Sequence, residues 1–228
     1  MKLKRLFTLA VASAGVAFGA STAQAAVIID ASTQAYYNDG LGDLAPALGT
    51  QTSAGGFSLF PAANVSGGDP TIPPIATAPD VSSVTNLGSW LTNAAPTGGT
   101  WSAAPMAIPS TWAVNSETAI VYAINAGSGL SNVHIDLGVD NGIYVWLNGA
   151  YIFGAMAPGG AAITEYDIDI ASLGAGMHYL QILREDHGGQ TGYLIQMTAD
   201  RGQVPAPGAL ALLGIGLAGL GLSRRRTR

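Results

Sequence analysis

The sequence predicts an all-β protein: an antiparallel β-sandwich of jelly-roll type, with an N-terminal signal peptide and a C-terminal hydrophobic helix. After residue 116, apolar and polar residues alternate in short segments, and turns rich in glycine and asparagine separate these segments. This pattern is typical of an antiparallel sandwich. An apolar segment beside cationic residues also stands at each end of the chain. We therefore expect a signal peptide over 1–25, one β-sandwich domain over 26–203 and a sorting tail over 204–228.

The first 25 residues have the composition of a secretory signal peptide. Basic residues precede an apolar stretch over 6–20, and the small residues Ala23, Ala25 and Ala26 surround the expected cleavage point. We predict export by the Sec machinery and cleavage after Ala25. The chain has no cysteine, so the exported domain must be stable without disulfides.

Residues 26–116 are expected to be the loop-rich part of the domain. Alanine, glycine, proline, serine and threonine dominate this part, and short apolar islands occur at 27–29, 57–60, 81–90 and Trp101. We interpret these islands as brief strands that long loops connect.

Residues 117–203 carry the clear strand pattern. In the segment 132–139, four apolar side chains point to one side of the strand, whereas His134 and Asp136 point to the other. Asn148 and Gly149 tolerate the positive φ of a type I′ turn and therefore predict a β-hairpin. We expect strands at 118–125, 132–139, 143–147, 150–154, 166–170, 177–184 and 193–200.

Two segments of this second part resemble jelly-roll sugar-binding modules, such as the accessory sandwiches of glycosidases and the protective-antigen-like domains of microbial adhesins. They are residues 139–149, which read VDNGIYVWLNG, and residues 173–180, which read LGAGMHYL. In the calcium-dependent adhesins a pair of aspartates holds the metal that contacts the sugar. The resemblance thus implies calcium as a cofactor here, with Asp140 and Asn141 as its ligands and with one negative charge fewer.

Each candidate ligand-binding residue has a structural alternative. Asp140 and Asn141 are also typical of turns in which the side chain bonds the local backbone. In one interpretation, Trp146 and its neighbours Tyr144 and Tyr151 form an aromatic platform for a sugar ring. In the other, Trp146 belongs to the core. Glu185 and Asp186, with His187, form the densest polar cluster of the chain, which we place in a loop before the last strand. A charged turn is the alternative for this cluster.

The tail over 204–228 predicts a membrane helix. An apolar and glycine-rich run over 208–222 follows a proline motif and ends at a cluster of arginines. This order resembles the PEP-CTERM sorting signal, which an exosortase cuts to release a protein to the cell surface or extracellular matrix. The expected motif residues are Val204, Pro205, Ala206, Pro207, Arg224, Arg225 and Arg226. Because Ala206 replaces the glutamate of that family, an uncut membrane anchor is the alternative.

Charge and motifs narrow the function. Between residues 26 and 203, two arginines stand against fourteen acidic residues, so this part has a net charge of −12. Such a charge repels nucleic acids, which we exclude as partners. The sequence contains no recognisable catalytic motif. We predict a non-catalytic protein of the cell surface or matrix that acts in adhesion or exopolysaccharide binding; the alternative is a secreted polysaccharide hydrolase that uses loop carboxylates.

Overall fold

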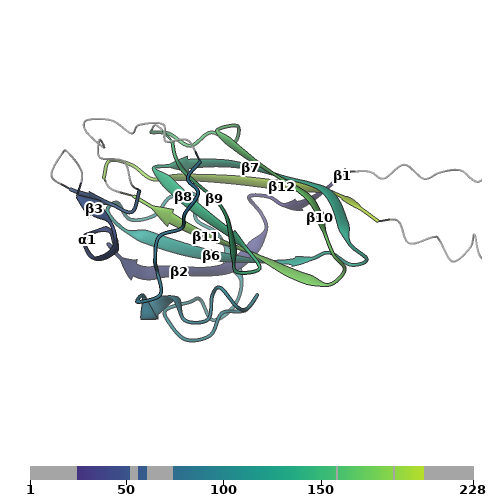
Figure 1. Cartoon of the computed structure of the whole chain (residues 1–228), viewed down its shortest axis with the longest axis horizontal. Helices are drawn as coiled ribbons and strands as arrows, with labels where there is room; N and C mark the ends of the chain where they lie inside the picture. The colour runs from purple at the N-terminus through teal and green to yellow at the C-terminus, as the bar shows by residue number, and fades with distance from the viewer. Residues whose placement is uncertain (1–24, 52–55, 61–73, 158, 187, 203–228) are drawn as a thin grey trace, which may run out of the picture.

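Two antiparallel β-sheets pack face to face in a computed structural model of the chain (Figure 1). The structure describes residues 25–51, 56–60, 74–157, 159–186 and 188–202. The predicted β-sandwich is confirmed. Residues 1–24 and 203–228, which include the expected apolar part of the signal peptide and the expected tail helix, lie outside the described residues. Within those described, no helix is long and apolar enough to cross a membrane.

The two sheets share the strands unequally. The four-stranded sheet has the order β1 (Ala25–Ile29), β12 (Gly192–Arg201), β7 (Leu130–Asp140) and β10 (Tyr166–Leu173). The six-stranded sheet has the order β5 (Met106–Ala107), β2 (Gln34–Gly42), β6 (Glu117–Asn125), β11 (Met177–Glu185), β8 (Gly142–Leu147) and β9 (Ala150–Met156). A short ribbon of β3 (Thr50–Gln51) and β4 (Phe57–Ser58), the helix α1 (Ala45–Leu48) and the 3-10 turn η1 (Thr85–Leu87) complete the elements.

The strands predicted after residue 116 are confirmed, with ends that coincide or differ by at most three residues. Their alternation explains the core between the sheets, because β7 buries one face and leaves His134 and Asp136 half-exposed on the other. The hairpin is confirmed as well: Asn148 and Gly149 have φ values of 52° and 78° and join β8 to β9. The buried residues of this inner core include Ile120, Tyr122, Ile124, Val133, Ile135, Leu137, Val139, Ile143, Val145, Leu180 and Ile182.

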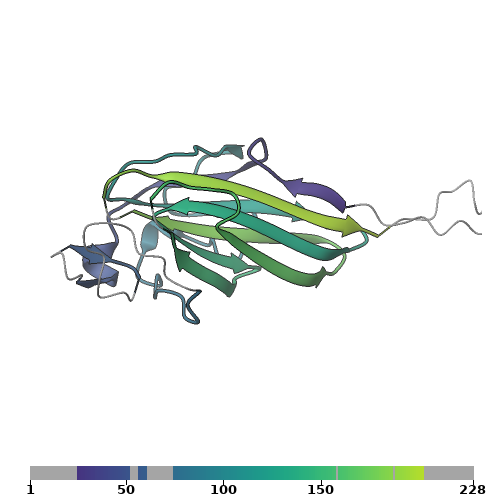
Figure 2. The same ribbon diagram turned by 90° about the horizontal axis from the view of Figure 1, so that it is seen from above.

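The first half of the chain builds a second core on the outer face of the six-stranded sheet. Segments 41–51, 56–60 and 75–101 cover that face and bury side chains that alternate with the inner set: Ala119, Val121, Tyr144, Trp146 and Leu183. The central strands are therefore buried on both faces, and β6 has a nearly continuous buried sequence. Figure 2 shows this loop-rich layer beside the two sheets.

Three sequence-based expectations for the first half are wrong. Trp101, the last of the apolar islands, lies in a loop rather than in a strand. The island 81–90 forms turns and η1 rather than a strand, because its apolar residues pack against the second core without pairing. In contrast, β2 is a nine-residue strand beside β6 that the sequence did not predict. Its residues Asn38, Asp39 and Gly40 are typical of turns, yet Asn38 is buried and its Oδ1 accepts hydrogen bonds from Gly40 N and Thr100 Oγ1.

Both ends of the described chain leave the sandwich at one end. Ala25 pairs with Asp200 in the ladder between β1 and β12, so the first and last strands of the described chain end at the same end of the four-stranded sheet (Figure 1). At the far end of the same sheet, Gly192 pairs with Asp140. Eight residue steps along β12 separate these two pairs, about 26 Å at the usual rise of a strand. The Asp140–Asn141 corner thus lies at the end of the sandwich remote from the tail.

Candidate functional site

Asp140 and Asn141 form a buried corner between the two sheets. The strand β7 ends at Asp140 in the four-stranded sheet, and β8 begins at Gly142 in the six-stranded sheet. The peptide bond between the two residues is cis. Asp140 Oδ1 accepts a hydrogen bond from Asn141 Nδ2 at 3.0 Å, and Asp140 Oδ2 accepts one from Gly160 N at 2.9 Å. The carboxylate of this pair thus joins the corner to the loop after β9. The proposed calcium ligation stays a prediction.

Glu185 lies in a strand rather than in a loop as predicted. It is the last residue of β11 and is buried, because the segment 57–60 covers it. Its Oε1 accepts hydrogen bonds from Ser58 Oγ at 2.8 Å and from Leu59 N at 3.0 Å. Burial raises the pKa of Glu185 to about 7, against the effect of these two donors. The carboxyl group therefore fastens the covering segment to the sheet.

Asp186 lies just beyond β11 and is buried as well. Its Oδ2 accepts hydrogen bonds from the backbone nitrogens of Gly188, at 2.9 Å, and Asn115. His187 lies outside the described residues. Because Gly142 pairs with Glu185, the two sequence-predicted polar pairs do meet at one end of the sandwich. Across the described ranges, however, no group of three or more histidine or acidic side chains converges to hold a metal ion.

The aromatic residues around Trp146 form a cluster rather than an open platform. Trp146 and Tyr151 have ring centroids 5.5 Å apart, and Tyr144 and Tyr151 have theirs 6.4 Å apart, as the predicted hairpin requires. Segment 75–101 covers them, so that Tyr144 is 1% and Trp146 3% exposed. Their side chains therefore belong to the second core, and one edge of Trp146 remains accessible in a pocket.

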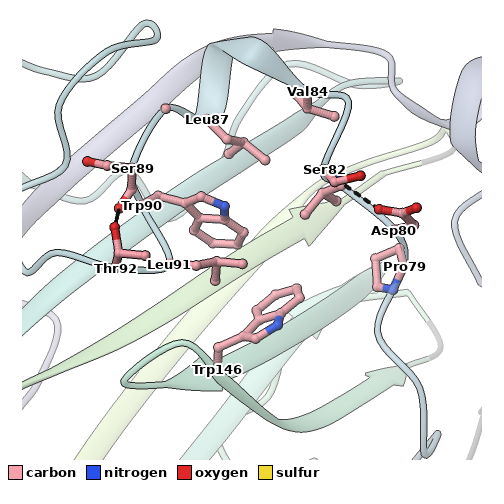
Figure 3. A pocket seen from close by; sticks show the side chains of 12 residues that line it. Pro79, Asp80, Ser82, Val84, Leu87, Ser89, Trp90, Leu91, Thr92 and Trp146 are labelled. Carbon is pink, nitrogen blue, oxygen red and sulfur yellow. Dashed lines mark hydrogen bonds between the residues drawn. The ribbon is translucent and has the colours of Figure 1, made fainter.

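This pocket lies between β8 and the loop 79–92 (Figure 3). Its cavity of ≈ 300 Å³ is at the lower end of the range for small-ligand sites. Trp90 from the loop and Trp146 from β8 meet there in a T-shaped arrangement, with ring centroids 5.0 Å apart. Hydroxyl and carboxylate groups from the loop line the same space: Asp80, Ser82, Ser89 and Thr92. The pocket thus combines aromatic edges with a polar rim.

The indole nitrogens distinguish these two tryptophans from the others. Trp101 Nε1 donates a hydrogen bond to Leu87 O, and Trp112 Nε1 donates one to Ser116 O. For Trp90 and Trp146, which are 2% and 3% exposed, no acceptor within the described residues takes the indole N–H. A nearly buried donor without a partner favours an acceptor from outside the protein.

Two contacts hold the loop of the pocket in place. Gln181 lies on β11 directly beside Trp146, and its Nε2 donates a hydrogen bond to Trp90 O at 3.2 Å. Its Oε1 accepts one from Gly149 N at 3.3 Å. The hairpin also approaches the loop so closely that a Cβ on Gly149 would lie 2.3 Å from Leu91 O. The Asn148–Gly149 turn is therefore part of the frame of the pocket.

Sequence reasoning identified Trp146 but missed Trp90 and Gln181. Trp90 belongs to the island 81–90, which was interpreted as a strand. Its flanking residues Ser89 and Thr92 are typical of turns and were the available signal for a loop. Nothing in the local sequence marks Gln181, because its role depends on which loop crosses the outer face of its strand.

The tail matches a known sequence family. Residues 203–226 match the PEP-CTERM protein-sorting motif. The chain carries a PEP-CTERM sorting signal. This motif implies that the protein is exported, that an exosortase-type enzyme processes it and that the membrane anchors it transiently. Ala206 lies inside the matched residues, so its difference from the usual glutamate does not remove the motif.

Other comparisons concern the sandwich and the whole chain. Among solved structures, the PA14 domain of the antifreeze protein MpAFP is similar to this chain at 17% sequence identity and a TM-score of 0.28. The similarity covers 46% of this chain and 52% of that chain, so that this protein spans about half of the length of that structure. No curated protein matches the sequence.

Proposed function

We propose that this PEP-CTERM protein is a non-catalytic polysaccharide-binding protein of the cell surface or extracellular matrix, and that the pocket of Trp90 and Trp146 contacts the sugar. The observation that carries the proposal is the pair of indole N–H groups in a pocket with a hydroxyl-rich rim. Sugar hydroxyls accept hydrogen bonds from such donors, and apolar faces of a sugar pack well against aromatic edges.

Charge restricts the kind of polysaccharide. The part between residues 26 and 203 has two arginines and fourteen acidic residues. Asp80, whose carboxylate accepts a hydrogen bond from Ser82 N at 3.0 Å, contributes one of these negative charges at the pocket itself. Anionic sugar chains would be repelled. We therefore propose neutral hexose units as the ligand.

The position of the pocket suits a protein that a tail holds at a membrane. β12 leads directly into the sorting tail, and it belongs to the four-stranded sheet. The pocket lies on the outer face of the other sheet, against β8. The anchored form would therefore present the pocket to one side of the sandwich, away from the strand that bears the tail.

Burial of the candidate carboxylates favours binding over the alternative of hydrolysis. A hydrolase needs two carboxyl groups that flank a bound glycosidic bond. Glu185 and Asp186 are buried at 0% and 1% exposure, and both accept hydrogen bonds from backbone nitrogens. For this reason we propose no catalytic role for either residue.

The test is binding of the full chain to an array of neutral and acidic glycans, with tryptophan fluorescence as the quantitative readout. Trp146→Phe keeps an aromatic ring and removes the N–H donor, so we expect about a fivefold weaker association with neutral glycans, as the loss of one hydrogen bond of about 1 kcal/mol gives. Trp112→Phe is the matched control, because Trp112 lies outside the pocket and bonds Ser116 O.

Three outcomes would contradict the proposal. They are the absence of binding to any neutral glycan, equal affinity of the Trp146→Phe variant and the wild type, and turnover of the bound glycan. A parallel series in the presence of a chelator examines the separate prediction that Asp140 and Asn141 hold calcium. Loss of glycan binding on chelation, reproduced by Asp140→Asn, would support that prediction.

A further inference from the structure

Two glycine-rich turns close the end of the sandwich that bears the tail. The turn over 126–129 joins β6 to β7, and the turn over 174–176 joins β10 to β11. The two turns contact each other, because Ala126 N donates a hydrogen bond to Gly176 O at 2.8 Å. Gly176 N in turn donates one to Gly127 O at 3.2 Å. These bonds join the end of one sheet to the end of the other.

The chain enters the tail from this same end. After β12 ends at Arg201, Gly202 N donates a hydrogen bond to Gly129 O at 3.4 Å, and Ser128 Oγ donates one to Gly202 O at 3.3 Å. The last described residue is therefore fixed to the first turn. We use the name tail-end surface for residues 125–129, 174–177 and 200–202.

A short connection ties the tail-end surface to the membrane. The sorting motif matches residues 203–226, and its apolar run begins at residue 208. The five residues between Gly202 and that run can span at most about 20 Å. β1 begins at Ala25, opposite Asp200 of β12, so the expected signal peptide adjoins the same surface until it is cleaved. In the anchored form, the tail-end surface thus lies within a short reach of lipid.

The distribution of charge suits an anionic lipid surface at this end of the sandwich. The two turns contain no charged residue, and Arg201 stands exposed beside them. Its neighbour Asp200 accepts a hydrogen bond from Asn132 Nδ2 at 2.7 Å. Strand register and hydrogen bonds place six acidic residues at the opposite end: Asp43, Glu117, Asp140, Glu165, Glu185 and Asp186.

These acidic residues are too far from the tail-end surface to oppose contact with lipid. Their end lies about 26 Å away along β12 at the usual rise of a strand. This distance is about three times the Debye length of about 8 Å at physiological salt. Repulsion between the six carboxyl groups and anionic headgroups is therefore largely screened, whereas Arg201 would contact those headgroups directly.

An apolar side chain adds to the affinity of this surface for lipid. Met177 follows the turn over 174–176 directly and is 58% exposed, more than any other large hydrophobic side chain in the described part of the chain. A methionine side chain is unbranched and flexible, so it adapts to an irregular apolar surrounding. The small residues Ala175 and Gly176 are exposed beside it and leave room for lipid headgroups.

We propose that the tail-end surface docks on the phospholipid headgroups of the membrane that anchors the tail. Met177 inserts between headgroups, and the guanidinium of Arg201 pairs with a lipid phosphate, which its planar array of donors fits well. Docking would direct the acidic end of the sandwich away from the membrane. The proposal rests on the sorting tail and is independent of the proposed polysaccharide contact.

The test uses the absence of cysteine from the chain, because a single introduced cysteine can then carry a fluorescent dye. The full chain is reconstituted through its tail into vesicles of neutral and anionic phospholipids, and part of the lipid bears a quencher on its headgroup. We expect strong quenching of a dye at Ala175→Cys, on the tail-end surface. A dye at Gln190→Cys should be quenched little, because Gln190 is exposed in the loop before β12, at the opposite end.

A double variant tests the two contacts that the proposal names. With the dye at residue 175, Met177→Ser together with Arg201→Gln should lower the ratio of docked to undocked molecules about fivefold, as expected for the loss of one basic contact with an anionic surface. Val114→Ser is the matched control. Val114 is 48% exposed, but it lies at the other end, where the backbone of Asn115 donates to Asp186.

Two results would overturn the proposal. Equal quenching of the dyes at residues 175 and 190 would show that the sandwich turns freely on its connection to the tail. Unchanged quenching in the double variant, or an equal loss in Val114→Ser, would show that Met177 and Arg201 make no specific contact with lipid. Neither result affects the glycan array, which tests the polysaccharide proposal separately.

Discussion

The backbone of the hairpin turn at Gly149 lies very close to the backbone of the pocket loop at Leu91. This close contact allows a matched test of how the fold positions that loop. Gly149 has a φ of +78°, and a Cβ at this position would lie 2.3 Å from Leu91 O. Gly127 has a φ of +57°, and nothing lies within 4 Å of the corresponding Cβ position. Alanine at either position therefore carries the same left-handed backbone cost, about 1–2 kcal/mol. Alanine at 149 alone also meets a backbone atom.

The difference between Gly149→Ala and Gly127→Ala isolates the steric contribution. An ordinary carbon–oxygen contact is about 3.3 Å or longer, so the loop at Leu91 must move by about 1 Å. Overpacking of this kind costs about 1–3 kcal/mol. For a domain of this size, the melting temperature of Gly149→Ala should then lie about 2–12 °C below that of Gly127→Ala.

Urea denaturation and thermal unfolding, both followed by circular dichroism, measure this difference. We also expect weaker glycan binding in Gly149→Ala, because Leu91 and Thr92 line the pocket. Equal stability of the two variants would refute the argument that the hairpin and the loop are in tight contact. Reduced stability with unchanged glycan affinity would show that the hairpin supports the fold but not the pocket.

Two further predictions concern titratable groups. Burial raises the pKa of Glu117 to about 8 and that of Glu185 to about 7, so the folded chain binds more protons than the unfolded chain above pH 4.5. The free energy of unfolding should therefore fall as the pH rises from about 5 to 8. Urea midpoints should show a much flatter profile for the Glu117→Gln, Glu185→Gln double variant. A wild-type profile as flat as that of the double variant would contradict this assignment. On the outer face of the four-stranded sheet, His134 Nδ1 lies 2.7 Å from Asp169 Oδ1, and this hydrogen bond, with the nearby charge of Asp136, raises the pKa of His134 above 6.5. Proton NMR titration should show this increase, and Asp169→Asn should lower the pKa toward its ordinary value; no change in that variant would exclude the hydrogen bond as the cause.

The sequence predicted those elements whose formation depends on local residue pattern. The alternation in β7 and the Asn148–Gly149 turn are properties of neighbouring residues, and both appear as expected. The sorting tail was also predicted, because its order of proline motif, apolar run and arginines is visible in the local sequence. The failures lie in the first half, where β2 and the turns of 81–90 acquire their structure from the sheet on which they pack.

Candidate site residues show the same division. The sequence singled out Trp146, Glu185 and the Asp140–Asn141 pair as polar or aromatic residues near turns. It did not indicate that Glu185 and Glu117, which stands 68 positions earlier, are both buried, or that Trp90 meets Trp146 from a distant loop. These relations depend on strand register across β6, β11 and β8, which no local pattern encodes.

Export, the β-sandwich and its acidic character were thus determined by the amino-acid sequence alone, since hydrophobic periodicity, turn residues and charge act over a few neighbouring positions. The tertiary structure decided that the six-stranded sheet is covered on both faces. That covering turns surface positions into a second core, and it creates both the tryptophan pocket and the buried glutamate pair. The physical reason is that burial and electrostatic environment are set by segments far away in the chain, which meet only when the loop-rich half packs onto the sheet.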